Sequence, residues 1–206
     1  MTTYPAVIAL TAAVLVAFSI GSIPFGYLVG RLFYRTDIRT QGSGNIGAMN
    51  ALRTLGRGGG AAVLLLDALK GFIPVACASM LFGSASPNYA PAVAAAAVLG
   101  HCFSPWLGWR GGKGVATSFG AIFGLSWQAG LVAVGGWIAG ALLTQYSSVG
   151  SMLGSVAAPI ALWFFTRSPA ATVYGVFAAL LIIYTHRENL VRLRSGTEGP
   201  IRRFKR

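Results

Sequence analysis

Acidic residues are almost absent from this chain: only four of its 206 residues are Asp or Glu, and charged residues of both signs make up 10%. Soluble domains usually carry charge on about a quarter of their residues. A hydrophobic content of 55% and a mean hydropathy of +0.67 therefore exclude an ordinary water-exposed surface. The 28 glycines follow no Gly-x-y period, which excludes collagen, and the aliphatic content excludes disorder. This composition favours an all-α integral membrane protein.

Cysteine is equally scarce. Cys77 and Cys102 both lie in apolar runs without the spacing of metal ligands. We expect two buried thiols, with neither a disulfide nor a zinc site.

Long stretches without charge indicate membrane spans, because a helix needs about 20 apolar residues to cross about 30 Å of hydrocarbon. No signal peptide is expected, since the first charged residue, Arg31, follows the first apolar segment. We predict seven helices, of which the fourth, at about residues 114–125, is too short to span the membrane alone. Five crossings with two re-entrant segments is the alternative to seven crossings. Cutting the apolar runs at Gly, Pro, Ser and Asn clusters predicts helices at about residues 5–33, 60–82, 90–106, 114–125, 127–144, 149–166 and 169–186.

The chain has a net charge of +12, and the positions of its cations predict its orientation in the membrane. If the helices alternate in direction, five cations follow the first helix, two follow the third and seven follow the last, all on one side. By the positive-inside rule this side is cytoplasmic, with the N-terminus outside, the C-terminus inside and an odd number of crossings. The cations suit anionic lipid or phosphate-bearing substrates, and with so little soluble surface we do not expect a nucleic-acid partner.

Glycine pairs four residues apart recur within the predicted spans. Small residues at this spacing let helix backbones approach closely in lipid. We expect packing within one monomeric bundle, and a homodimer seam is the alternative. The pairs are Gly26 and Gly30, Gly120 and Gly124, Gly136 and Gly140, and Gly150 and Gly154.

The first polar cluster lies at residues 37–53. Its glycines satisfy Gly-x-Gly-x-x-Gly, but no strand precedes them, so a dinucleotide fold is excluded. Glycine turns and a helix beginning near Asn45 would still direct N–H groups toward an anion. Ser43, Asn45 and Asn50 add neutral donors, and Arg53 adds a planar fork for phosphate oxygens. Taken alone, the cluster fits a flexible glycine turn somewhat better.

The second cluster lies at residues 108–117 and contains Gly-Gly-Lys-Gly around Lys113. A Walker A loop is excluded because Leu107 and Gly114 occupy positions that require Gly and Ser or Thr. Glycines around a lysine at a helix start suit phosphate. The alternative is a membrane-edge lysine that reaches lipid headgroups.

The third cluster, residues 186–198, follows the last span. If the helix continues, His186 and Asn189 share a face. The histidine could be a base, a phosphate ligand or a cap on the helix end, and taken alone it fits the cap best.

Ionisable residues also occur inside the spans. Asp67 and Lys70 lie three residues apart in an apolar helix, where charge is expensive. We interpret them as a self-neutralising pair, or as a pair that supports the glycine loop, before any catalytic role. His101 is interpreted as a satisfied helix-end histidine.

Three phosphate-friendly clusters on one membrane face indicate two anionic ligands. No acidic cluster offers ligands for Mg²⁺, so we expect neither a metal nor another cofactor. This absence argues against kinases and alcohol phosphotransferases. Group transfer from a phosphate-activated donor fits better.

The residues in these clusters resemble the PlsY family of bacterial membrane glycerol-3-phosphate acyltransferases. The similarity covers nearly the whole chain in the family's order. Each motif is weak alone, and together they are specific. They lie at residues 21–26, 37–39, 42–47, 50–53, 67–71, 100–103, 111–117, 146–148 and 186–198.

The resemblance implies one seven-helix transmembrane acyltransferase domain, residues 1–206, in the bacterial inner or plasma membrane, with its active site facing the cytoplasm. Residues 196–206 would form a basic cytoplasmic tail, and we interpret the charges at residues 202–206 as a solvated strip that contacts anionic lipid. Such an enzyme transfers an acyl chain from acyl phosphate to the 1-hydroxyl of sn-glycerol 3-phosphate. The products are lysophosphatidic acid and inorganic phosphate, in the first step of phospholipid synthesis.

The resemblance also assigns residues. Met49 stands where the family usually has threonine, so a hydroxyl contact there is absent or replaced. The catalytic residues would be Arg53, Lys113 and His186, and the substrate-binding residues would be Ser43, Gly44, Asn45, Asn50, Thr117, Ser151 and Asn189.

The expected mechanism is direct attack of the glycerol hydroxyl on the acyl carbonyl, without a covalent intermediate. No aspartate stands five residues after His101 or His186, as the His-x-x-x-x-Asp acyltransferases require. The proton could pass to His186 or to the substrate's own phosphate. A transporter of a phosphorylated solute and a non-catalytic lipid-binding scaffold are the rival interpretations.

Overall fold

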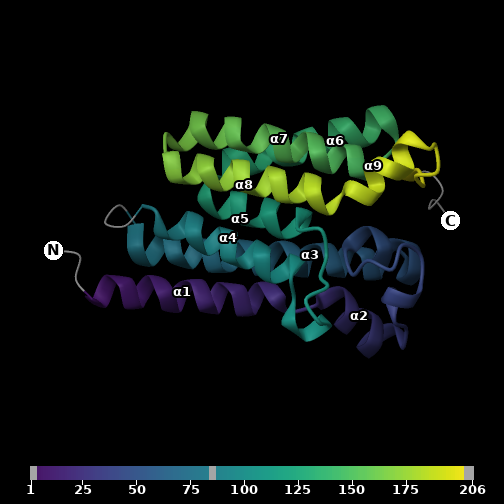
Figure 1. Cartoon of the computed structure of the whole chain (residues 1–206), viewed down its shortest axis with the longest axis horizontal. Coiled ribbons are helices and arrows are strands. Elements are labelled where there is room, and N and C mark those ends of the chain that lie inside the picture. Colours follow the sequence, from purple (N-terminus) through teal and green to yellow (C-terminus); the bar gives the residue numbers. More distant parts are fainter. Residues whose placement is uncertain (1–3, 84–86, 202–206) are drawn as a thin grey trace.

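The computed structural model describes residues 4–83 and 87–201. Within these residues the chain is helical and contains no strand, which confirms the predicted all-α membrane fold. The helices lie side by side along the long axis of the molecule (Figure 1). The α-helices are α1 (Tyr4–Ser22), α2 (Phe25–Tyr34), α3 (Ala48–Phe82), α4 (Tyr89–Cys102), α5 (Val115–Leu125), α6 (Trp127–Thr144), α7 (Ser147–Thr166), α8 (Pro169–Thr185) and α9 (Arg187–Arg194), with 3-10 turns η1 (Ile38–Thr40) and η3 (Pro105–Leu107).

Five segments are long and apolar enough to cross a membrane: α1, α3, α4 extended to Leu107, α6 and α7. The pair α8 and α9 gives a sixth if counted together, although it bends by 54°. Helix α5 has 11 residues, which rise only about 16 Å. A count of seven therefore depends on counting α5 and α8, and it stays a prediction, as does the orientation.

Side-chain size separates the interior from the lipid-facing surface. Large apolar side chains cover the outside, for example Leu143 at 83% exposure, whereas the buried core is rich in alanine. Helices in lipid associate through close packing because lipid tails are as apolar as the side chains. A Cβ atom on Gly140 would lie 2.8 Å from Gly150 Cα, and one on Gly136 would lie 3.0 Å from Gly154 Cα. These glycines therefore pack α6 on α7 within one chain, as predicted.

The first predicted helix, residues 5–33, is wrong as a single element. It breaks at Ile23 and Pro24, because proline has no N–H for the helix ladder and its ring clashes with the preceding turn. The carbonyls left at the break are satisfied by other segments. Lys70 Nζ donates to the Ile23 carbonyl at 2.8 Å, and Ser104 Oγ donates to the Ser22 carbonyl at 2.6 Å.

Helix α3 begins earlier than predicted, at Ala48 instead of residue 60. The glycines between residues 56 and 60 looked like a break, yet only Gly56 leaves helical geometry, with φ of 80°. Asn50 and Arg53 consequently lie on a helix. The helix does not begin near Asn45, because the Asn45 side chain accepts a hydrogen bond from Gly47 N at 2.9 Å and forms a turn there.

The remaining predicted boundaries agree within a few residues, except that α4 ends at Cys102 and not at residue 106. Both cysteines are free, and Cys102 is buried as predicted. The prediction for Cys77 is wrong because its thiol lies on the exposed surface of α3.

Candidate active site

The three polar clusters gather at one end of the bundle. Helix α2, the start of α3, and α9 all lie toward the right-hand end of Figure 1, opposite the N-terminal end. The three clusters are close enough to interact through their charges. Arg53 from the first cluster and Glu198 from the third both shift the pKa of Lys113 from the second. The predicted convergence on one face is therefore found in the fold.

Asn50 holds the glycine loop together from inside. Its side chain is 2% exposed, and its Oδ1 accepts from Ser43 N at 2.8 Å. Its Nδ2 donates to the carbonyls of Ile38 at 2.7 Å and Asn45 at 2.8 Å. Both polar groups of Asn50 are thus engaged within the loop. The structure gives it a part in shaping the loop, and a direct contact with a ligand stays a prediction.

The loop so formed leaves Ser43 exposed to solvent. Gly42 and Gly44 have φ of 58° and 68°, in the left-handed region that glycine adopts without strain. Gly44 N donates to the Gln41 carbonyl at 3.0 Å and so closes the turn. The Ser43 hydroxyl at the loop tip is therefore accessible to a ligand.

Arg53 lies one turn after Asn50 and points toward the C-terminal segment. A Cβ atom on Gly199 would lie 4.0 Å from Arg53 Nη2. The charges of Glu198 and Arg192 act on the half-buried guanidinium. Arg53 therefore adds a cation beside the C-terminal segment.

The glycine-lysine loop, residues 111–114, leads into α5. Gly114 has φ of 83° and precedes the first residue of α5, so Lys113 stands next to the positive end of this helix. The Lys113 carbonyl accepts from Thr185 Oγ1 at 3.0 Å, and its Nζ donates to Asn189 Oδ1. Burial and then the charge of Arg192 lower the pKa of Lys113 to about 8.

His186 lies at the bend between α8 and α9. Four of the eight residues of α9 are charged, so the apolar segment ends at Thr185. His186 Nδ1 lies 2.8 Å from the Ile182 carbonyl. A carbonyl oxygen only accepts, so Nδ1 carries the hydrogen and Nε2 keeps a lone pair. Burial and then the Lys113 charge lower the pKa of His186 to about 4, so the ring is neutral at pH 7.

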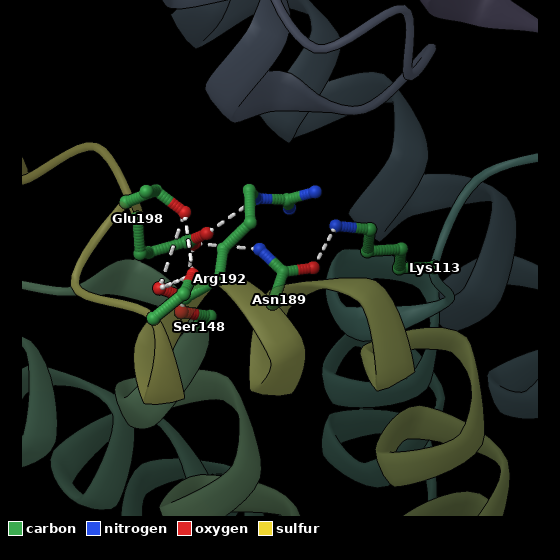
Figure 2. Close-up of polar contacts among 7 residues, drawn as sticks. Lys113, Ser148, Asn189, Arg192 and Glu198 are labelled. Atoms are coloured by element: carbon green, nitrogen blue, oxygen red, sulfur yellow. Dashed lines mark hydrogen bonds and ion pairs between the residues drawn. The ribbon is translucent and has the colours of Figure 1, made fainter.

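Glu198 is the acceptor that joins the third cluster to α7 and Lys113 (Figure 2). Its Oε1 accepts from Asn189 Nδ2 at 2.6 Å and from Ser148 Oγ at 3.0 Å, and its Oε2 accepts from Arg192 Nε at 2.8 Å. Burial alone would raise the pKa of Glu198, but these hydrogen bonds more than offset it and lower the pKa. An ionised Glu198 fixes Asn189 so that its oxygen faces Lys113.

Two predicted residues are placed differently from the rest. Ser151 is buried, and its hydroxyl donates to the Ser147 carbonyl of its own helix at 2.9 Å. Thr117 is fully buried in the first turn of α5. A ligand would reach either hydroxyl only after local rearrangement, and their substrate contacts stay predictions.

The sequence reasoning missed Ser148, Arg192 and Glu198 as parts of the site. Glu198 carried a usable signal, since it is one of only four acids and stands among arginines. Within the described ranges 4–83 and 87–201, no group of three or more His, Cys, Asp or Glu residues is placed to hold a metal. The polar groups that meet here are cations, amides, hydroxyls, one carboxylate and one neutral imidazole, a set suited to binding phosphate.

Known proteins match this chain over most of its length. The family described as "Glycerol-3-phosphate acyltransferase" matches residues 11–196. Glycerol-3-phosphate acyltransferases from Mesorhizobium japonicum and Dinoroseobacter shibae are each 44% identical, over 93% and 100% of this chain and 96% and 98% of their own lengths.

Two solved structures of PlsY, an integral membrane glycerol 3-phosphate acyltransferase, are also similar. The glycerol 3-phosphate form is 36% identical with a TM-score of 0.88, and the lysophosphatidic acid form is 34% identical with a TM-score of 0.86. Each comparison covers 93% of this chain and 95% of the other.

Proposed function

Because this chain belongs to the PlsY family of integral membrane glycerol-3-phosphate acyltransferases, we propose that it transfers an acyl group from acyl phosphate to the 1-hydroxyl of sn-glycerol 3-phosphate. The products are lysophosphatidic acid and inorganic phosphate. The convergence of Arg53, Lys113 and a neutral His186 at one end of the bundle carries this proposal.

The two cations suit a reaction with two phosphate groups. Lys113, beside the start of α5, and Arg53, beside the C-terminal segment, approach the site from different elements. Fixed positive groups that face a departing phosphate stabilise the charge that develops in the transition state. The acyl carbon–oxygen bond to phosphate breaks as the bond to the glycerol oxygen forms. No metal, cofactor or covalent intermediate is required.

His186 is suited to orienting the glycerol hydroxyl. Its Nε2 lone pair can accept a hydrogen bond from that hydroxyl, whereas a pKa of about 4 makes it a weak base at neutral pH. The proton then passes more readily to an oxygen of the substrate's own phosphate. His186 therefore acts mainly on binding and alignment.

Replacing His186 by glutamine should raise KM for glycerol 3-phosphate about tenfold or more and leave kcat within about tenfold. The glutamine oxygen can still accept from the hydroxyl, and the loss of a true general base would instead lower kcat by about 10²–10⁴. Steady-state kinetics on His186→Gln, with His186→Ala as the variant without an acceptor, measures the split. A kcat loss beyond 10² with unchanged KM would assign the base to His186.

The pH dependence of kcat/KM should show whether the reaction requires the Lys113 ammonium. In the free enzyme its ammonium is present below a pKa of about 8 and is lost as the pH rises through 8. We therefore expect kcat/KM for glycerol 3-phosphate to fall between pH 8 and 9.5, since this ratio reports free-enzyme ionisations. The break in kcat should lie at higher pH, because a bound phosphate raises the lysine pKa. Lys113→Arg keeps its charge throughout, so its profile should lack the limb.

The setting of the reaction belongs to the same proposal. We infer seven crossings, an outside N-terminus and an active site on the cytoplasmic side of a bacterial inner or plasma membrane, in one monomeric domain of residues 1–206. The acyl chain enters from the bilayer between apolar helices. Residues 196–201 pack into the site through Glu198, and contact with anionic lipid is assigned to residues 202–206, which lie outside the described part.

The decisive experiment is phosphate release by purified protein in detergent, given palmitoyl phosphate and glycerol 3-phosphate. Release that requires both substrates and fails with palmitoyl-CoA supports the proposal. A transporter of a phosphorylated solute would produce no phosphate in detergent but would move solute into sealed vesicles. A lipid-binding scaffold would do neither.

A further inference from the structure

A buried ionic trio lies beneath the site, outside the residues assigned to chemistry. Asp67 and Lys70 of α3 and His101 of α4 are each at most 3% exposed. Lys70 Nζ lies 2.8 Å from Asp67 Oδ1, and His101 Nδ1 lies 3.6 Å from the same oxygen. Buried ion pairs contribute little net stability compared with apolar packing. Stability alone therefore gives a weak explanation of the trio.

The His101 ring lies directly against the glycine-lysine loop. A Cβ atom on Gly112 would lie only 2.1 Å from His101 Nε2 and 2.7 Å from Cε1. Gly112 N donates to the His101 carbonyl and Gly111 N donates to the Cys102 carbonyl, each at 3.0 Å. The loop therefore sits on the end of α4, and only a residue without a side chain fits over the imidazole.

Lys113, the next residue, is held from the other side. Thr185 donates to its carbonyl, and its Nζ donates to Asn189. Residues 111–113 are consequently clamped between His101 below and the α8 and α9 segment above. Any shift of the imidazole would move the backbone immediately before Lys113.

We propose that His101, packed against Gly112, is a positioning residue that sets where Lys113 meets phosphate. This inference rests on the proposed function of Lys113 as a phosphate-binding cation. Asp67 Oδ1 lies 3.6 Å from the ring, the ring supports Gly112, and Gly112 places Lys113. Lys70 completes the trio and also satisfies the Ile23 carbonyl, which joins the loop support to the break between α1 and α2.

The test is a suppressor experiment with His101→Ala, Gly112→Ala and the double variant. Gly112→Ala forces a methyl group into the ring, so its affinity for inorganic phosphate and for glycerol 3-phosphate should fall about a hundredfold. His101→Ala removes the imidazole that supports Gly112. It should raise the dissociation constants for inorganic phosphate and for glycerol 3-phosphate about tenfold. In the double variant the methyl group occupies space vacated by the ring, so we expect at least tenfold recovery relative to Gly112→Ala.

Calorimetry on the folded fraction, checked by size exclusion and thermal melting in detergent, separates positioning from simple stability. A merely structural role lowers the folded yield without changing either dissociation constant. If Gly112→Ala does not fold, the two dissociation constants of His101→Ala decide between positioning and a merely structural role. No recovery in the double variant, or unchanged affinity in His101→Ala, would overturn the proposal.

A double-mutant cycle with Lys113→Ala tests whether His101 affects phosphate binding through Lys113. In a Lys113→Ala background, His101→Ala should cause no further loss of phosphate affinity, whereas independent effects would add. Wild-type protein that binds inorganic phosphate but does not transfer acyl groups would defeat the proposed reaction and leave this inference standing. Wild-type protein that binds neither phosphate compound would defeat both.

Discussion

Replacing Lys113 by alanine should lower kcat/KM for glycerol 3-phosphate by about 10²–10³, the usual effect of removing one preorganised group that stabilises transition-state charge. The side chain is half-buried, so its charge is less screened than that of a surface lysine. Its Nζ also donates to Asn189, whose other end is held by Glu198. The variant therefore loses both a cation and the order of the amide beside it.

Arg57→Ala is the matched control for this prediction. It removes the same unit of charge from an exposed position on α3, one turn beyond Arg53. Because exposed charges are screened by salt, its kcat/KM should stay within about threefold of wild type. Phosphate release from palmitoyl phosphate measures both variants. If Lys113→Ala behaves like Arg57→Ala, the lysine is a headgroup contact at the membrane edge.

The second large effect concerns helix packing. Gly71→Ala should destabilise the protein by about 3 kcal/mol or more, at or above the upper end of overpacking costs. A Cβ atom there would lie 2.0 Å from the Thr117 carbonyl oxygen of α5, and backbone cannot rotate away as a side chain can. The strain falls on the first turn of α5, directly after the glycine-lysine loop. Thermal melting in detergent and phosphate release should both report the loss.

Gly135→Ala supplies the control on α6, where no atom lies within 4 Å of the added Cβ. Alanine has the better helix propensity, so this variant should be neutral or more stable by about 0.5–1 kcal/mol. Equal melting temperatures for Gly71→Ala and Gly135→Ala would mean that α3 and α5 are not packed backbone to backbone.

The sequence predicted well what depends on local chemistry. Charge-free runs located the apolar helices, and the glycine clusters with Arg53, Lys113 and His186 identified the segments that form the site. The break at Pro24 had a local cause as well, since proline interrupts a helix ladder, but it was hidden inside one long apolar run. The fourth predicted segment, close to α5, was correctly recognised as too short to span alone.

What sequence reasoning could not supply was the direction of individual side chains. Asn50 looked like a ligand donor, yet the loop it supports takes both of its polar groups. Ser148 and Ser151 lie one turn apart, and only Ser148 contacts Glu198. These choices depend on how distant segments meet. The support of Gly112 by His101 likewise joins α4 to a loop that begins after the chain has reversed direction.

The position of Glu198 in the chain has a consequence for how the protein is made. Left-handed Gly196 turns the chain back after α9, Thr197 N donates to the Arg192 carbonyl at 2.8 Å, and Ile201 N donates to the Gln145 carbonyl at 2.8 Å. This part of the site is thus made only after α1 to α9 have been translated. A nascent chain interrupted before Glu198 would have inserted every apolar helix into the membrane and still lack the carboxylate that orders Asn189 and Arg192. Termination of the chain between Arg194 and Glu198 should therefore yield inserted but inactive protein.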